Sequence, residues 1–278
     1  MELTHTDIKA PYLSEEGYQD AVPSGTLQTV ARALAVLQCF TLQEPELTAA
    51  EISNRSGLPR PTVYRLLATM EGLGFIARDP DTRRYRPGLE VVTLASIALN
   101  QMEVRRQALP ELYLLVNRLR LGANLAILRH NEVFYLESIP HPKQVTMFSL
   151  VGRRNPVHAT ALGKVLLAGL STARAEAILR RCDLRPYGPR TLTTIEDLLT
   201  DLEKVRLRGY AIDDEEWLIN ARCLAAPIYD RTSQVVAALS ISGPGTEIRE
   251  DKQETLARDL LESAGRASYK LGFARAHM

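Results

Sequence analysis

The chain has 278 residues, of which 34 are Lys or Arg and 33 are Asp or Glu, so its formal net charge is +1. Its length favours two domains, and its 45% hydrophobic and 24% charged residues exclude global disorder and collagen-like or coiled-coil-only architectures. Three scattered cysteines exclude a disulfide framework or a zinc ribbon, and no apolar run approaches the roughly 18 residues that span a bilayer. The first residues lack the basic and apolar regions of a signal peptide. We therefore expect a reduced cytoplasmic protein with no metal site, no cofactor and no membrane partner.

An acidic arm precedes the first periodic segment. Residues 1–24 contain five acidic residues and one lysine, and they show no apolar periodicity. Leu27, Val30 and Leu34 then recur at helical spacing, which predicts a helix over residues 26–40. We therefore expect a flexible arm over residues 1–24, followed by a folded domain.

Two more helices and a hairpin are expected next. Thr48 and Glu51 have the spacing of a capping box, and Gly57 is suited to ending the helix that this box begins. The expected elements are helices at residues 48–56 and 59–73 and strands at residues 75–78 and 83–87. This order is that of a winged helix-turn-helix, which we assign to residues 25–88.

Arginine is locally enriched in this segment. Between Glu51 and Gly88 there are seven arginines and four acidic residues, in a chain that is otherwise almost neutral. Such an excess is typical of a phosphate-binding module, and arginine at the start of a recognition helix can bond guanine in the major groove. Arginines on the wing are expected to contact phosphate or the minor groove. The candidate DNA-binding residues are Thr48, Arg60, Thr62, Tyr64, Arg65, Arg83, Arg84 and Arg86.

The rest of the chain predicts a linker and a second domain. Residues 89–109 form a helix of mixed polarity that Pro110 is expected to end, and such a helix suits a linker or a dimer contact. Beyond it, strands and helices interleave, with hairpins at residues 130–132 and 230–234 and a strand at residues 145–151. This pattern predicts an α+β domain over residues 110–278 rather than a doubly wound sheet.

Several separated blocks carry a resemblance to a known family. They are LQTVARALAVLQCF, LTAAEISNRSGLPRPTVYRLLATMEGLGFIARDPDTRRYRPG, NPVHATALGKVLLAGL, GYAIDDEEW, RCLAAPIYD and VVAALSISGPG. In this order they resemble the IclR family of transcriptional regulators, over about Leu27 to Leu271. The resemblance implies a winged helix, a linker helix and a GAF-like effector-binding domain, in a protein that binds DNA as a dimer or a dimer of dimers.

The resemblance also implies an effector site. By this resemblance, four residues match family positions that contact a small acid, namely Asp213, Cys223, Ser240 and Ser242. Small residues open the helix near residue 160, and the free backbone N–H groups there suit a carboxylate. Members that bind glyoxylate have Gly-Ala where this chain has Ala161-Leu162. An aromatic or longer acid is therefore also a candidate effector of this chain. The candidate effector-binding residues are Thr160, Ala161, Leu162, Asp213, Cys223, Ser240 and Ser242.

We therefore expect a sequence-specific DNA-binding regulator, a homodimer or homotetramer, of a catabolic operon and controlled by an oxo, hydroxy or aromatic acid. One alternative is a metabolite sensor that acts through protein–protein contacts. Another is an enzyme of small-acid metabolism, which would need His158, Cys223 and Asp213 as a nucleophilic triad. A structural role for His158, and packing roles for Cys223 and Trp217, are the simpler alternatives to these sites.

Overall fold

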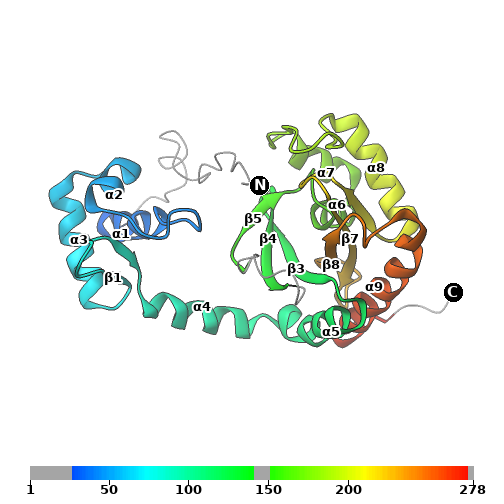
Figure 1. Ribbon diagram of the computed structural model, residues 1–278, viewed down its shortest axis with the longest axis horizontal. Helices are drawn as coiled ribbons and strands as arrows, with labels where there is room; N and C mark the ends of the chain where they lie inside the picture. Colours follow the sequence, from blue (N-terminus) through cyan, green and yellow to red (C-terminus); the bar gives the residue numbers. More distant parts are fainter. Residues whose placement is uncertain (1–26, 141–150, 275–278) are drawn as a thin grey trace. The chain divides into compact units, whose positions relative to one another are not determined.

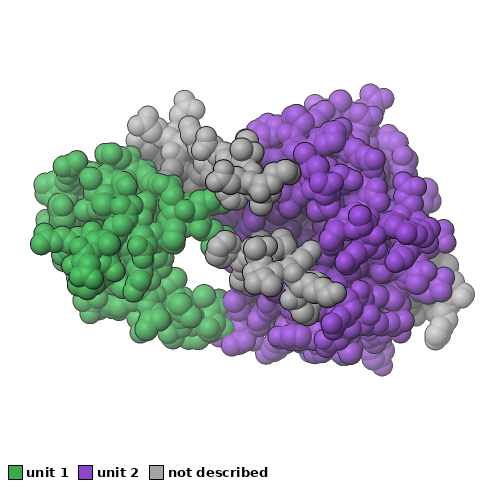
Figure 2. Space-filling view, viewed as in Figure 1, with its two compact units in different colours: residues 1–98 green, residues 99–278 purple. Residues whose placement is uncertain are grey.

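The computed structural model describes residues 27–140 and 151–274, and the chain divides into two compact units, residues 1–98 and 99–278 (Figures 1 and 2). The expected acidic arm lies outside the described residues. So does the strand expected at residues 145–151, except for Val151, which lies in a turn. Among the helices of the described part, none is long and apolar enough to cross a membrane.

The first unit has the helices and hairpin of a winged helix-turn-helix. Thr48 and Glu51 form the expected capping box at the start of the second helix, and Gly57 ends that helix with a φ of +67°. The two strands form an antiparallel hairpin. The elements are α1 (Gln28–Gln38), α2 (Ala49–Ser56), α3 (Arg60–Gly72), β1 (Ile76–Arg78) and β2 (Tyr85–Pro87).

The apolar core of this unit contains residues from α1, α2, α3 and the hairpin. Ile52, Val63 and Leu67 are fully buried in it. Helix α1 differs from this pattern, because its Val30 and Leu34 side chains are each 53% exposed. Their spacing thus located the helix correctly, yet the apolar stripe faces solvent in the single chain.

Two helices follow, and the break between them lies at Met102 instead of at Pro110. Helix α4 (Leu89–Gln101) ends before Met102, and α5 (Glu103–Leu119) contains Pro110 in its interior. The prediction that Pro110 ends a helix is therefore wrong. Proline inside a helix costs about 3 kcal/mol, and we attribute its tolerance here to the burial of the residues on either side, among them Leu112, in the core of the second unit.

The second unit is built on a six-stranded antiparallel sheet of order β5-β4-β3-β8-β7-β6. Its strands are β3 (Gly122–Arg129), β4 (Glu132–Ile139), β5 (Arg154–Pro156), β6 (Ala211–Asp214), β7 (Ala221–Tyr229) and β8 (Val235–Pro244). Its further helices are α6 (Ala161–Ala168), α7 (Thr172–Leu179), α8 (Ile195–Arg208) and α9 (Glu250–Lys270). The predicted α+β fold, with an antiparallel sheet, is confirmed.

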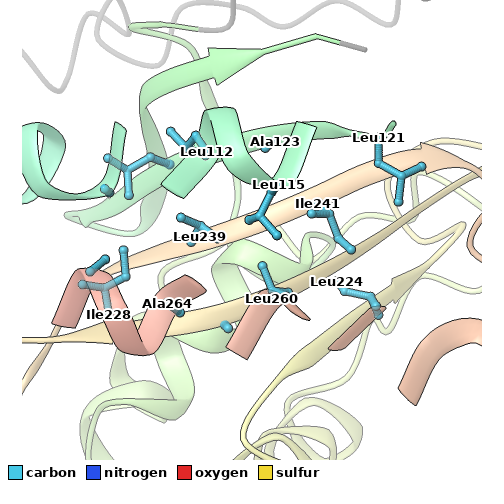
Figure 3. Close-up of a cluster of buried hydrophobic side chains, with 14 of the residues drawn as sticks. Leu112, Leu115, Leu121, Ala123, Leu224, Ile228, Leu239, Ile241, Leu260 and Ala264 are labelled. Atoms are coloured by element: carbon cyan, nitrogen blue, oxygen red, sulfur yellow. The ribbon is translucent and has the colours of Figure 1, made fainter. Parts of the chain in front are cut away.

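The two faces of this sheet are covered by different helices. On one face, Leu239 and Ile241 of β8 pack with α5 and α9 in a large apolar cluster (Figure 3). On the other face, a second apolar cluster joins the sheet to α6, α7 and α8. Because successive side chains of a strand alternate between faces, Ser240 and Ser242 lie on the α6 face.

Candidate functional site

Helix α3 divides into a buried and an exposed face. Val63 and Leu67 are buried, whereas Arg60, Tyr64 and Arg65 are exposed to solvent. Thr62, also predicted to bind DNA, is half-buried. The first two turns of α3 therefore present two arginines and a tyrosine on a helix that the core of the unit holds in place.

The wing arginines differ in how they are held. Arg83 and Arg86 are exposed, and Arg86 lies 3.5 Å from a carboxylate oxygen of Glu46. Arg84 is half-buried and turns inward, where it donates to the carbonyl oxygen of Glu46 at 3.0 Å and to the Glu51 carboxylate at 2.9 Å. Arg84 thus contacts the capping box of α2, while Arg83 and Arg86 project from the wing.

Thr48 is also engaged within the unit. Its hydroxyl oxygen accepts from the Glu51 N–H at 3.2 Å, and its own N–H donates to the Glu51 carboxylate at 2.7 Å. These bonds satisfy the first turn of α2. Thr48 and Arg84 therefore hold the helix and the wing together. The sequence predicted the capping role of Thr48, but it did not predict the structural contacts of Arg84.

The structure brings together the four effector candidates of the sheet. Asp213, Cys223 and Ser242 lie opposite one another on β6, β7 and β8, and Ser240 lies two residues from Ser242 on the same face. Asn124 of β3 joins them, since its Nδ2 lies 3.3 Å from both the Ser240 and the Ser242 hydroxyl oxygens. We call Asp213, Cys223, Ser240, Ser242 and Asn124 the polar row.

The three candidates at the start of α6 are all buried. The Thr160 hydroxyl caps the helix by accepting from the Gly163 N–H at 3.1 Å, and it donates to the Pro156 carbonyl oxygen at 2.9 Å. Ala161 and Leu162 lie in the apolar cluster between α6 and the sheet. An added Cβ at Gly163 would lie 2.2 Å from the Val157 oxygen, so only glycine permits this close approach.

Burial controls the charge of the polar row. Burial, with the added repulsion of Glu216, raises the pKa of Asp213 to about 7, although its carboxylate accepts from the backbone N–H groups of Glu216 and Trp217. Burial also raises the pKa of Cys223 well above its usual value, so that residue stays a neutral thiol. A neutral thiol is a poor nucleophile. The His158 ring contacts a backbone group instead, since its Nε2 lies 3.1 Å from the carbonyl oxygen of Arg185.

A buried ion triad lies beside the polar row, and the sequence did not predict it. The Lys164 ammonium lies 2.6 Å from Glu216 and 2.9 Å from Asp201. A lysine within the apolar run ALGKVLLA was its only signal. Because two carboxylates already neutralise Lys164, this ammonium is not available to an anionic ligand.

Asn124 was also missed, although it is a lone amide within the apolar run GANLAIL. Trp217, the single tryptophan of the chain, packs against Tyr187 with ring centroids 4.4 Å apart. The backbone N–H of Trp217 donates to the Asp213 carboxylate, so this residue adjoins the polar row. In the described part of the chain, no group of three or more His, Cys, Asp or Glu residues is arranged to hold a metal ion.

Comparisons with known proteins agree over both units. A family model described as the IclR helix-turn-helix domain matches residues 29–80, and one described as the bacterial transcriptional regulator IclR C-terminal domain matches residues 96–269. The HTH-type transcriptional regulator XynR of Escherichia coli K12 is 36% identical over 89% of this chain and 98% of its own length. The regulator KdgR of Dickeya chrysanthemi is 32% identical over 89% of this chain and 81% of its own.

Solved structures give the same result. The IclR protein of Thermotoga maritima has a TM-score of 0.74 and 29% identity, over 89% of this chain and all of that one. An IclR homolog from Microbacterium hydrocarbonoxydans, solved in complex with 4-hydroxybenzoate, has a TM-score of 0.78 and 31% identity, over 87% of this chain and 98% of that one. The chain therefore belongs to the IclR family and is a transcriptional regulator with a DNA-binding helix-turn-helix domain.

Proposed function

We propose that this regulator binds a specific operator as a homo-oligomer, controls a catabolic operon, and changes its DNA affinity when a small organic acid binds. The observation that carries the proposal is the exposed face of the first two turns of α3, where Arg60 and Arg65 project from a helix whose other face is buried. A helix in this position enters the major groove in helix-turn-helix proteins, and a bidentate arginine–guanine pair discriminates by about 1–3 kcal/mol.

The wing supplies contacts of a different kind. Arg83 and Arg86 are exposed on the hairpin, where they suit phosphate contacts that position the protein without reading sequence. Binding through several phosphates falls steeply as salt rises. We expect a footprint on the promoter next to the regulator's own gene that weakens strongly between low and physiological salt. A regulator acting only through protein contacts would give no protection at any salt concentration.

The acid binds, in this proposal, between the polar row and the start of α6. Lys164 is neutralised by its two carboxylates, so the effector carboxylate meets neutral donors, namely the hydroxyls of Ser240 and Ser242 and the N–H groups at the start of α6. The 4-hydroxybenzoate complex of the Microbacterium homolog supports an acid of this size. Thermal-shift screening of small acids tests it, because a ligand that favours the folded state raises its melting temperature.

Exposed apolar side chains support a dimer. Helix α4 buries none of its residues in the single chain, and α1 exposes a stripe of its own. Contiguous exposed apolar surface marks an interaction site. The residues are Leu27, which caps α1, Val30 and Leu34 of α1, and Leu89, Val92, Leu94 and Ile97 of α4. We propose that these helices join two copies, and that residues 89–109 transmit the effector signal by favouring one arrangement of the copies over another.

A further inference from the structure

Asn155 and Tyr135 form a buried polar pair outside the polar row. Their side chains are 4% and 5% exposed, and the Asn155 Nδ2 donates to the Tyr135 hydroxyl oxygen at 3.1 Å. The other amide atom, Asn155 Oδ1, is buried and has no hydrogen-bond partner among the described residues. An unsatisfied buried acceptor costs about 1–3 kcal/mol. This oxygen therefore favours the binding of a hydrogen-bond donor that lies outside the described residues.

The pair lies on the same face of the sheet as the polar row. Tyr135 of β4 is paired with Ala126 of β3, which is paired in turn with Ala238 of β8, two residues before Ser240. Asn155 of β5 borders β4 on this face. Since side chains two residues apart share a face, the pair and the polar row both lie on the side of the sheet that α6 covers.

The two side chains offer complementary groups. Burial, with nearby Cys223 adding to it, raises the pKa of Tyr135, so its hydroxyl stays protonated. This oxygen accepts from Asn155, and its hydrogen has no acceptor within residues 27–140 and 151–274. A hydrogen-bond donor on Tyr135 thus lies next to an acceptor on Asn155. A ligand hydroxyl matches both, since it accepts one hydrogen bond and donates another.

We propose that Asn155 and Tyr135 form a second anchor of the effector site, which binds a hydroxyl group and selects hydroxy acids over the same acids without it. The inference rests on the proposed acid site. The effector carboxylate binds at Ser240 and Ser242, and its hydroxyl donates to Asn155 Oδ1 while it accepts from Tyr135. An acid without the hydroxyl leaves Oδ1 unsatisfied, and sites built for a hydroxyl reject such analogues strongly.

Matched acid pairs test the second anchor in the full-length protein. The probes are 4-hydroxybenzoate against benzoate and lactate against propionate, with binding measured by calorimetry and by Trp217 fluorescence. We expect the hydroxy acid of at least one pair to bind the wild type about tenfold or more tightly, equivalent to about 1.4 kcal/mol. Asn155→Leu and Tyr135→Phe should each reduce that ratio to within about threefold, mainly by weakening the hydroxy acid.

The outcomes separate this inference from the acid site itself. Wild-type protein that binds both members of every pair equally contradicts the second anchor and leaves the acid site standing. Variants that lose both members of a pair to the same extent contradict it as well. Absence of binding by all four acids contradicts the acid site and the anchor together. Tyr135→Phe removes a single oxygen, so it keeps the test decisive if Asn155→Leu does not fold.

As a matched control, the double variant Ser240→Ala/Ser242→Ala should weaken both members of a pair equally. In our proposal the hydroxyls of Ser240 and Ser242 bind the effector carboxylate, and all four acids carry this group. A change in the hydroxy-to-deoxy ratio in this variant would place the hydroxyl at the polar row instead of at Asn155 and Tyr135, and would overturn the inference.

Discussion

The guanidinium group of Arg84 on the wing lies 2.9 Å from the Glu51 carboxylate at the start of α2. The same carboxylate closes the Thr48 capping box, so one acidic group links helix α2 to the β1–β2 hairpin. The arginines of the wing therefore divide into one that holds the fold and two that project from it.

This division predicts different effects for neighbouring arginines. Arg84→Gln should lower the free energy of unfolding by about 1 kcal/mol, because it removes the bonds to Glu51 and to the Glu46 carbonyl oxygen at a partly exposed site. Arg83→Gln should leave stability unchanged and weaken DNA binding at low salt. Denaturant unfolding and DNA titrations on both variants check this. Equal stability of the two variants would contradict a structural role for Arg84.

The raised pKa of Asp213 predicts a pH-dependent stability. The folded chain holds this proton up to about pH 7, whereas the usual value is 3.8, so the folded state binds more protons between these values. Stability contributed by this group therefore falls as pH rises through that window, by up to about 4 kcal/mol at roughly 1.4 kcal/mol per pH unit. Asp213→Asn removes the ionisation, so its stability relative to wild type should increase from pH 4 to pH 7. A constant difference, measured by denaturant unfolding, would refute this.

The ion triad predicts a large loss when its cation is removed. Lys164→Met leaves the buried Glu216 and the partly buried Asp201 as carboxylates without their cation, which should cost about 3–5 kcal/mol. Adding Glu216→Gln should restore part of that stability, because one uncompensated charge disappears. Lys204→Met, an exposed lysine on α8, is the matched control and should change the free energy of unfolding little. Similar losses for the two lysine variants would exclude the triad as the cause.

The exposed stripes of α1 and α4 predict a loss of assembly. Leu34→Asp and Leu94→Asp should each shift the protein toward monomers in sedimentation experiments and weaken operator binding, while the fold of the single chain is kept, since both side chains are exposed in it. Leu207→Asp places the same charge on an exposed leucine of α8 and should leave the assembly unchanged. An unchanged oligomer in the α1 and α4 variants would place the interface elsewhere.

Local signals were sufficient for most of the first unit. The capping box at Thr48 and the glycine at residue 57 depend on neighbours within a few residues, and both appear in the structure. Pro110 was misjudged because its effect depends on tertiary packing, where a buried helix outweighs the intrinsic cost of proline.

The second unit shows what a single sequence cannot provide. Asn124, Tyr135 and Asn155 lie far from Asp213 along the chain, and only the register of the antiparallel strands places them on its face of the sheet. The family resemblance supplied Asp213, Cys223, Ser240 and Ser242, because it carries three-dimensional information that periodicity lacks. The partners of Lys164 depend likewise on how α6 and α8 pack.

The central claim is that the exposed face of the first two turns of α3 reads operator sequence. Fluorescence anisotropy of the full-length protein on its operator and on a scrambled duplex, for wild type, Arg65→Ala and Arg86→Ala, tests it most directly. We predict that Arg65→Ala loses operator affinity by about tenfold or more and scrambled-duplex affinity far less, whereas Arg86→Ala weakens both alike. Equal losses on the two duplexes for Arg65→Ala, or no loss at all, would contradict the claim.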